Sequence, residues 1–163
     1  MLRSRIAMVL ALFGVSAACG GPGADAEVPQ AQPAGVTSAD IGDHVVHFSA
    51  QATDKLSPEV ASAYNITRSK SRAMVTVSII DEDGGHSTAG DVSVKTVNLT
   101  GQLKNVTMRR IDEPGTAGAR GAIYYIGTTP VANRETLVFD ISVTPEGVNT
   151  PSEVRFKQQF YTD

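Results

Sequence analysis

From Asp43 onward, apolar side chains recur at every second position, and this period of two constrains the fold more than any other feature of the sequence. Successive side chains of a β-strand point to opposite faces of the sheet, so the pattern predicts strands with one buried and one solvated face. A surface helix would need a period of 3.6 residues instead. The clearest case is TLVFDISV, in which one face carries Leu137, Phe139, Ile141 and Val143.

Seven such segments, separated by turn signals, predict an immunoglobulin-like antiparallel β-sandwich for residues 43–163. The segments are 43–50, 73–80, 91–99, 104–110, 122–128, 136–143 and 153–161. The fifth is apolar on both faces, which predicts a central strand. In the third, the apolar positions change parity near Lys95, and we expect a β-bulge there.

One segment, KLSPEVASAYNIT, departs from the period of two. Ser57 suits the N-cap of a helix and Pro58 suits its first position. Asn65 tolerates the left-handed conformation that ends many short helices. We therefore expect a short helix from Pro58 to Tyr64, which closes an open end of the sandwich with Val60 and Tyr64.

The N-terminus has the layout of a secretory signal peptide: two arginines followed by an uncharged apolar run of 13 residues. A membrane-spanning helix needs about 20 residues. Cys19, the single cysteine, follows directly, and Ser-Ala-Ala-Cys resembles a bacterial lipobox, in which the cysteine carries the lipid. We expect residues 1–18 to be removed and Cys19 to be acylated. Cleavage after Ala26 is the alternative and would leave a soluble periplasmic protein.

Residues 19–42 are rich in Gly, Pro and Ala, which predicts a disordered tether. Removal of residues 1–18 leaves 12 basic and 17 acidic side chains, a formal charge of −5. We expect no nucleic-acid partner, and membrane attachment through the lipid alone. Gly20 after the cysteine resembles the sorting pattern for the outer membrane, so we expect the protein on the periplasmic side of that membrane.

Three histidines raise the hypothesis of a periplasmic metal site. His44 and His47 are three residues apart and would face opposite sides of one strand, so both cannot bind one ion. We expect them on the surface of an edge strand, and metal binding through His44, His47 and His86 stays the alternative function. The acidic DEDGG segment predicts a hairpin turn.

The stretch TRSKSR places Arg68, Lys70 and Arg72 on one side of an extended chain. Such a stripe can meet an anionic partner, or it can keep an exposed strand edge soluble. These three residues are the candidate partner surface.

Patterns of nucleophilic catalysis and phosphate binding are missing from the sequence. It has no G-x-S-x-G elbow, and no glycine-rich phosphate loop between a strand and a helix. Asp112 and Glu113 are neighbours and would face apart in a strand, which makes a poor acid and base pair. We expect no enzyme activity and no cofactor.

Several blocks resemble a family of small gammaproteobacterial envelope proteins known only as a domain of unknown function. They are LSPEVASAYNITRSKSRAMVTVSI, LTGQLKNV, AIYYIGTTPVANRETLVFDISVTPEG and FKQQFY. The resemblance covers residues 43–163 and implies export, but no reaction or ligand. Together with the residues above, it leads us to expect a non-catalytic accessory or protein-binding module of the envelope, whose partner is an envelope protein of unknown identity.

Overall fold

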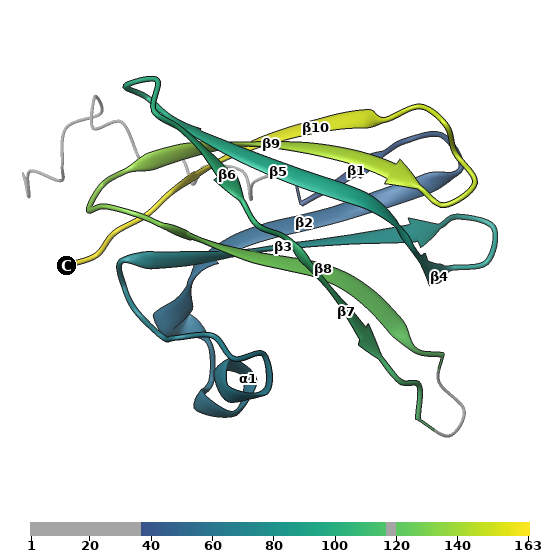
Figure 1. Cartoon of the computed structure of the whole chain (residues 1–163), viewed down its shortest axis with the longest axis horizontal. Helices are drawn as coiled ribbons and strands as arrows, with labels where there is room; N and C mark the ends of the chain where they lie inside the picture. Colours follow the sequence, from purple (N-terminus) through teal and green to yellow (C-terminus); the bar gives the residue numbers. More distant parts are fainter. Residues whose placement is uncertain (1–36, 117–119) are drawn as a thin grey trace, which may run out of the picture. The chain divides into compact units, whose positions relative to one another are not determined.

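The structure is a computed structural model that describes residues 37–116 and 120–163. In these residues ten strands form two antiparallel sheets, and residues 53–71 between β2 and β3 hold the 3₁₀ turn η1 and the helix α1 (Figure 1). The elements are β1 (Ser38–Asp40), β2 (His44–Ala52), η1 (Thr53–Lys55), α1 (Pro58–Ala63), β3 (Arg72–Asp81), β4 (His86–Thr88), β5 (Gly90–Asn98), β6 (Leu103–Val106), β7 (Arg109–Glu113), β8 (Ala122–Pro130), β9 (Thr136–Pro145) and β10 (Ser152–Gln159).

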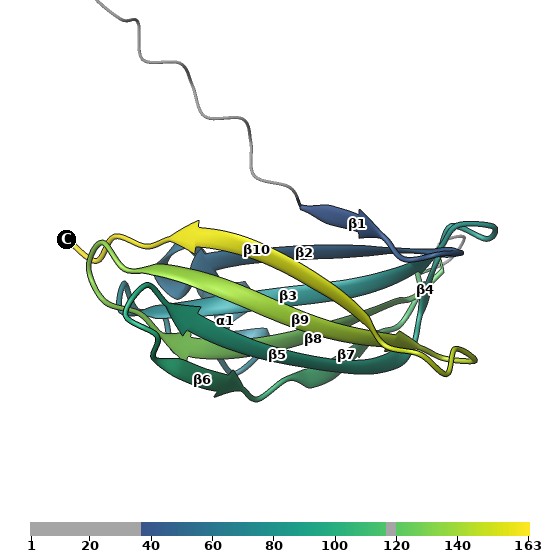
Figure 2. The ribbon, with the colours of Figure 1, turned by 90° about the horizontal axis from the view of Figure 1, so that it is seen from above.

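Sheet A has the order β1-β2-β3-β8-β7, with β4 also paired to β3, and sheet B has the order β10-β9-β5-β6. Figure 2, seen from above, shows the strands of sheet B lying over those of sheet A. The predicted all-β antiparallel sandwich is confirmed. The additional strands are β1 and β4, and the segment 104–110, predicted as one strand, contributes to both β6 and β7.

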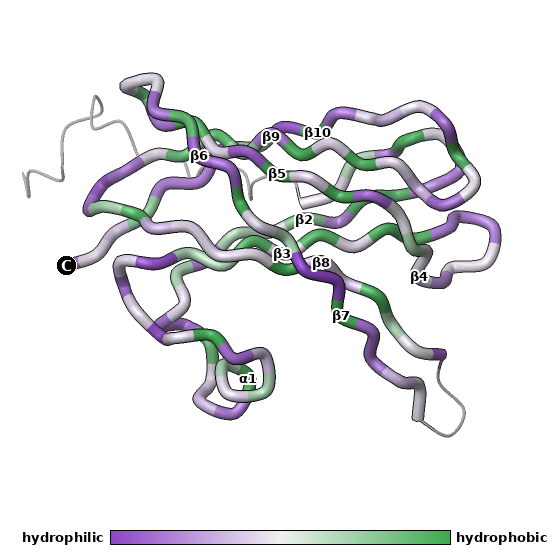
Figure 3. The backbone as a smooth tube through the Cα atoms, in the orientation of Figure 1, coloured by the Kyte–Doolittle hydropathy of each residue, from purple (hydrophilic) through white to green (hydrophobic). Residues whose placement is uncertain are grey.

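The period of two builds the core between the sheets. Burial alternates without a break along β9, and Figure 3 shows hydrophobic and hydrophilic positions alternating along the strands. Phe48 of sheet A stacks on Phe156 of sheet B with ring centroids 4.9 Å apart, and Phe156 stacks on Phe139 at 4.7 Å. The aromatic side chains therefore join the two layers, as expected for inward-facing positions.

Tyr125 adds a polar link between the sheets. It is 6% exposed, and its hydroxyl donates to the Gly90 carbonyl at 2.7 Å and accepts from the Gly90 N–H at 2.8 Å. Gly90 begins β5, so a strand of sheet A holds the start of a strand of sheet B. The neighbouring Tyr124 faces the other side of sheet A, as expected for adjacent strand residues.

The predicted bulge near Lys95 is wrong. The pairing of β5 with β9 is one-to-one from Gly90 to Asn98. The parity change has another cause: Thr96, not an apolar residue, takes the inward position and is fully buried. Its hydroxyl lies 3.5 Å from the Lys104 carbonyl of β6, which partly satisfies it.

The helix forms as predicted, but its predicted position is wrong. The Ser57 side chain accepts from the Val60 N–H, Pro58 occupies the first turn, and Asn65 follows with φ +51°. The helix does not close an end of the sandwich. It packs on the outer face of sheet A, where Leu56 and Ala61 bury against Met74, while Val60 stays 39% exposed.

The chain passes from sheet B to sheet A between β6 and β7, close to Gly127 of β8. A Cβ at Gly127 would lie 2.6 Å from Met108 Sδ, 2.7 Å from Val106 Cγ1 and 2.8 Å from the Thr107 carbonyl oxygen. Only a glycine lets the crossing segment approach β8 this closely. The crossing in turn places Arg109 and the rest of β7 at the edge of sheet A.

The predicted signal peptide, Cys19 and most of the tether lie outside the described residues. Residues 38–40 pair with β2 as strand β1, so the folded part begins before residue 43. In the part of the chain that the structure describes, no helix has the length and apolarity needed to cross a membrane.

We predict that Gly127→Ala lowers the free energy of unfolding by about 1–3 kcal/mol, because the crossing segment must move to admit the methyl group. Denaturant unfolding of the two proteins measures this difference. Ser49→Ala, at an exposed position of β2, is the control and should change stability by less than about 0.5 kcal/mol. Equal stability of Gly127→Ala and wild type would show that the crossing is not tightly packed.

Candidate functional site

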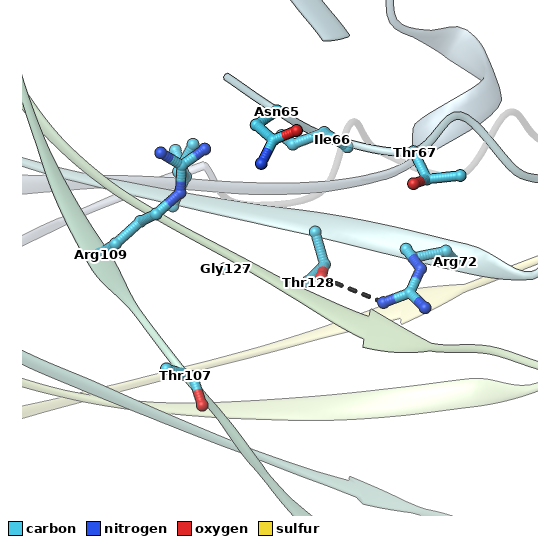
Figure 4. A pocket seen from close by; sticks show the side chains of 9 residues that line it. Asn65, Ile66, Thr67, Arg72, Thr107, Arg109, Gly127 and Thr128 are labelled. Atoms are coloured by element: carbon cyan, nitrogen blue, oxygen red, sulfur yellow. Dashed lines mark hydrogen bonds between the residues drawn. The ribbon is translucent and has the colours of Figure 1, made fainter. Parts of the chain in front are cut away.

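A cleft of about 280 Å³ opens on the outer face of sheet A, beside the helical excursion, which we define as residues 53–71 (Figure 4). It is lined by the end of the excursion (residues 65–67), the start of β3 (Arg72), the crossing segment and β7 (Thr107 and Arg109) and the middle of β8 (residues 126–128). Small-molecule sites are typically about 300–1,000 Å³. The volume of the cleft lies just below this range, so the cleft has room for a small group or for a few side chains of a segment that lies across it.

Hydrogen bonds at the base of the helical excursion hold the excursion in shape. Thr53 is fully buried, and its hydroxyl lies 2.9 Å from the Thr67 carbonyl oxygen and accepts from the Ser69 N–H at 2.9 Å. The first and last parts of the excursion are thus joined. At the helix end, the Ile66 N–H donates to the Ala61 carbonyl at 2.7 Å. Residues 65–67 are therefore held in place beside β8.

Two arginines project into the cleft from different strands. The Arg72 Nη1 donates to Thr128 Oγ1 at 3.3 Å, and the Arg109 Nη2 donates to the Tyr64 carbonyl. Figure 4 shows the two guanidinium groups on opposite sides of Thr128. Among the described residues the ion pairs are Arg110–Asp112 and Arg155–Asp140, so neither cleft arginine has a carboxylate partner there.

The other polar groups of the cleft are also open to a ligand. Within residues 37–116 and 120–163, the side chains of Asn65, Thr67 and Thr107 make no hydrogen bond to the protein. The lining contains no carboxylate, imidazole or thiol. The cleft thus offers donors that can hold an anion, and its own walls carry no general base.

Next to the cleft, three side chains form what we call the Tyr–Glu clamp: Tyr64, Glu113 and Tyr124. Both tyrosine hydroxyls donate to the Glu113 carboxylate, that of Tyr124 at 2.7 Å. Glu113 lies on β7 and Tyr124 on β8, whereas Tyr64 follows the helix α1. The clamp therefore fastens the excursion to the edge of sheet A.

The clamp shifts the pKa of each member. The two hydroxyl donors lower the pKa of Glu113, and the nearby carboxylate raises the pKa of Tyr64 and raises that of Tyr124 to about 12. A lowered carboxyl pKa contributes stability that is lost as pH falls through the folded-state value. A raised tyrosine pKa contributes stability that is lost as pH rises from the ordinary value of 10.0 through the folded-state value. The clamp is therefore strongest between these two limits.

The three basic residues of the predicted partner surface, Arg68, Lys70 and Arg72, each make a different contact in the structure. Arg68 donates to the Asp54 carbonyl at 2.8 Å, and Lys70 donates to the C-terminal Asp163 carbonyl oxygen at 2.5 Å. A turn at Lys70 and Ser71 interrupts the extended chain between them and β3. Of the three, only Arg72 lines the cleft.

The three histidines do not come together. Strand register places His44 opposite Asp81, and Asp81 opposite His86, whereas His47 lies opposite Ser78 on the other face of sheet A. Among the described residues, no group of three His, Cys, Asp or Glu side chains could hold a metal ion. The expectation that His44 and His47 lie on an edge strand is wrong, because β1 pairs with the outer side of β2.

Sequence reasoning missed Arg109 and the Tyr–Glu clamp. Arg109 and Glu113 are four residues apart, which places them on the same face of one strand. That spacing was available from the sequence. Their meeting with Tyr64 and Tyr124 was not, because it depends on where the excursion docks.

Most of the chain matches the model of a known protein family. A model described as "Domain of unknown function (DUF4426)" matches residues 38–163. The chain belongs to this family. The resemblance found in its sequence blocks is thereby confirmed, with a start a few residues earlier than residue 43.

A solved DUF4426 protein shares the fold. The crystal structure of a DUF4426 family protein from Pseudomonas aeruginosa is 30% identical in sequence and superposes with a TM-score of 0.64. The match covers 77% of this chain and 94% of the other. No curated protein matches the sequence of this chain.

We predict that Glu113→Gln lowers the apparent pKa of Tyr124 from about 12 toward 10.0, because the charged acceptor is removed. An ultraviolet absorbance titration of the tyrosines measures this shift. Glu153→Gln, which alters an exposed carboxylate of sheet B, is the matched control and should titrate like wild type. An unchanged titration of Glu113→Gln would contradict the clamp.

Proposed function

We propose that this protein is a non-catalytic binding module of the bacterial envelope, and that it binds a protein partner through the cleft beside the helical excursion. The observation that carries this proposal is the composition of the cleft. Arg72 and Arg109 supply cationic donors without internal carboxylate partners, and the lining supplies no group for proton transfer. Binding of an anionic group needs such cationic donors, and catalysis commonly needs a group that transfers protons.

The rigidity of the surroundings supports the proposal. The excursion is fixed by its packing on Met74, by the buried hydroxyl of Thr53 and by the Tyr–Glu clamp. Binding sites are often formed by irregular segments that a rigid scaffold positions. A site that is ordered before binding loses less conformational entropy when a partner arrives.

The envelope location rests on the sequence. An exported chain with an acylated Cys19 would be held at the periplasmic side of the outer membrane, and the tether would separate the domain from the lipid. This location also suggests that the partner is another protein of the envelope.

The partner can be sought by cross-linking the tagged full-length protein in intact cells and identifying the products by mass spectrometry. We expect one or more products with wild type that are reduced at least about fivefold in Arg109→Glu, because the change reverses the charge at the cleft. Lys157→Glu on β10 is the control for an equal charge change away from the cleft and should give the wild-type products.

The same products in equal amounts from all three proteins would remove the cleft from consideration. Circular dichroism spectra and thermal melts of each variant show that a loss is not caused by unfolding.

The membrane attachment has its own test. Cys19→Ser should move the protein from the membrane fraction to the soluble periplasmic fraction, because the acylated side chain is lost. If wild type is already soluble in the periplasm, lipidation at Cys19 is wrong and cleavage after Ala26 is supported.

A further inference from the structure

We infer that the occupant of the cleft is an extended acidic segment of the partner, with one carboxylate at Arg72 and a second at Arg109. The inference rests on the proposed function and names the chemistry that the cleft recognises.

The spacing of the two arginines favours two separate anionic groups. Arg72 lies opposite Pro130 and Arg109 lies opposite Ile126, on either side of β8. The two positions are thus offset by four residues along β8, about 13 Å, and by two strand spacings across it, about 10 Å. Each guanidinium is turned to its own protein acceptor. The separate backbone positions and separate acceptors favour one anionic group at each arginine over one small anion shared by both.

The free donors of the two arginines suit carboxylates. A guanidinium has five N–H donors in a planar fork that matches a carboxylate. Each cleft arginine uses only a single protein acceptor among the described residues. Because neither is neutralised by an internal carboxylate there, a ligand carboxylate would meet an uncompensated charge.

The rest of the lining suits an extended peptide. The side chains of Asn65, Thr67 and Thr107 can donate and accept hydrogen bonds, as a peptide backbone requires. Ile66 and Ile126 supply an apolar part of the lining. Side chains four residues apart share one face of an extended chain and are about 13 Å apart. The two arginine backbone positions are about 16 Å apart when the offsets along and across β8 are combined, and the long arginine side chains can cover the difference.

An anionic membrane surface suits the cleft less well than an acidic peptide segment does. The chain carries a formal charge of −3, which opposes approach to a continuous negative surface, whereas a single acidic segment needs to meet only the cleft. The small volume of the cleft also favours a narrow peptide over a branched phosphorylated glycan.

Fluorescence anisotropy with labelled synthetic peptides tests the inference on the full chain carrying Cys19→Ser. The probe is a Gly/Ser/Thr peptide with two aspartates four residues apart. Matched peptides carry two asparagines at those positions, or two aspartates three residues apart, which would face opposite sides. We expect the first to bind about tenfold more tightly than either of the others, which corresponds to about 1.4 kcal/mol.

Protein variants assign the contacts. Arg72→Gln and Arg109→Gln should each weaken binding of the first peptide about five- to tenfold, and Lys157→Gln should leave it unchanged. Thermal melts establish that each variant is folded. Equal binding of all peptides, or no effect of either cleft substitution, would overturn the inference.

Vesicles with and without phosphatidylglycerol test the alternative that the cleft binds an anionic lipid surface. Binding of the protein to the anionic vesicles that is abolished by both cleft substitutions, together with no peptide binding, would assign the cleft to a lipid surface and overturn the inference.

The two proposals can fail separately. If cross-linking in cells depends on Arg109 but the acidic peptides do not bind, the proposed function stands and the acidic segment is wrong. If the peptides bind as expected but cross-linking is unaffected, the chemistry of the cleft stands and the cellular role is wrong.

Discussion

Sheet A buries apolar side chains on both of its faces, and the candidate site depends on the outer of these two contacts. On the inner face it packs against sheet B through residues such as Val75 and Val77, both fully buried. On the outer face Met74 is buried beneath Leu56 and Ala61 of the helical excursion. Burial of a side chain such as Met or Leu contributes about 1.5–3 kcal/mol. The excursion is therefore part of the fold, and it keeps one side of the cleft in place.

The other side of the cleft depends on the passage of the chain from sheet B to sheet A. Gly127 lets the segment after β6 cross close to β8, and β7 then runs along the edge of sheet A with Arg109 and Glu113 on the outer face. Arg109 lines the cleft, and Glu113 fastens the excursion through the Tyr–Glu clamp. Two parts of the chain far apart in sequence thus meet because of the crossing and the docking of the excursion.

The alternation of apolar residues was sufficient to predict the sandwich, because each long strand buries one face. It could not reveal β1 and β4, since three residues are too few to show a period. It also could not show that the segment 104–110 changes sheets, because both sheets accept the same alternation. For the site, charge identified Arg72. The helix was predicted from its capping residues, but its position was not, because a helix that packs on the outer face of a sheet and a helix that covers an open end bury similar apolar side chains.

The docking of the helical excursion on the outer face of sheet A can be measured directly by nuclear Overhauser effects between methyl groups in solution. The account predicts cross-peaks between the Met74 methyl group and those of Leu56 and Ala61, because the three side chains form one buried cluster. Assigned spectra in which Met74 lacks both cross-peaks would contradict the docking and, with it, the cleft.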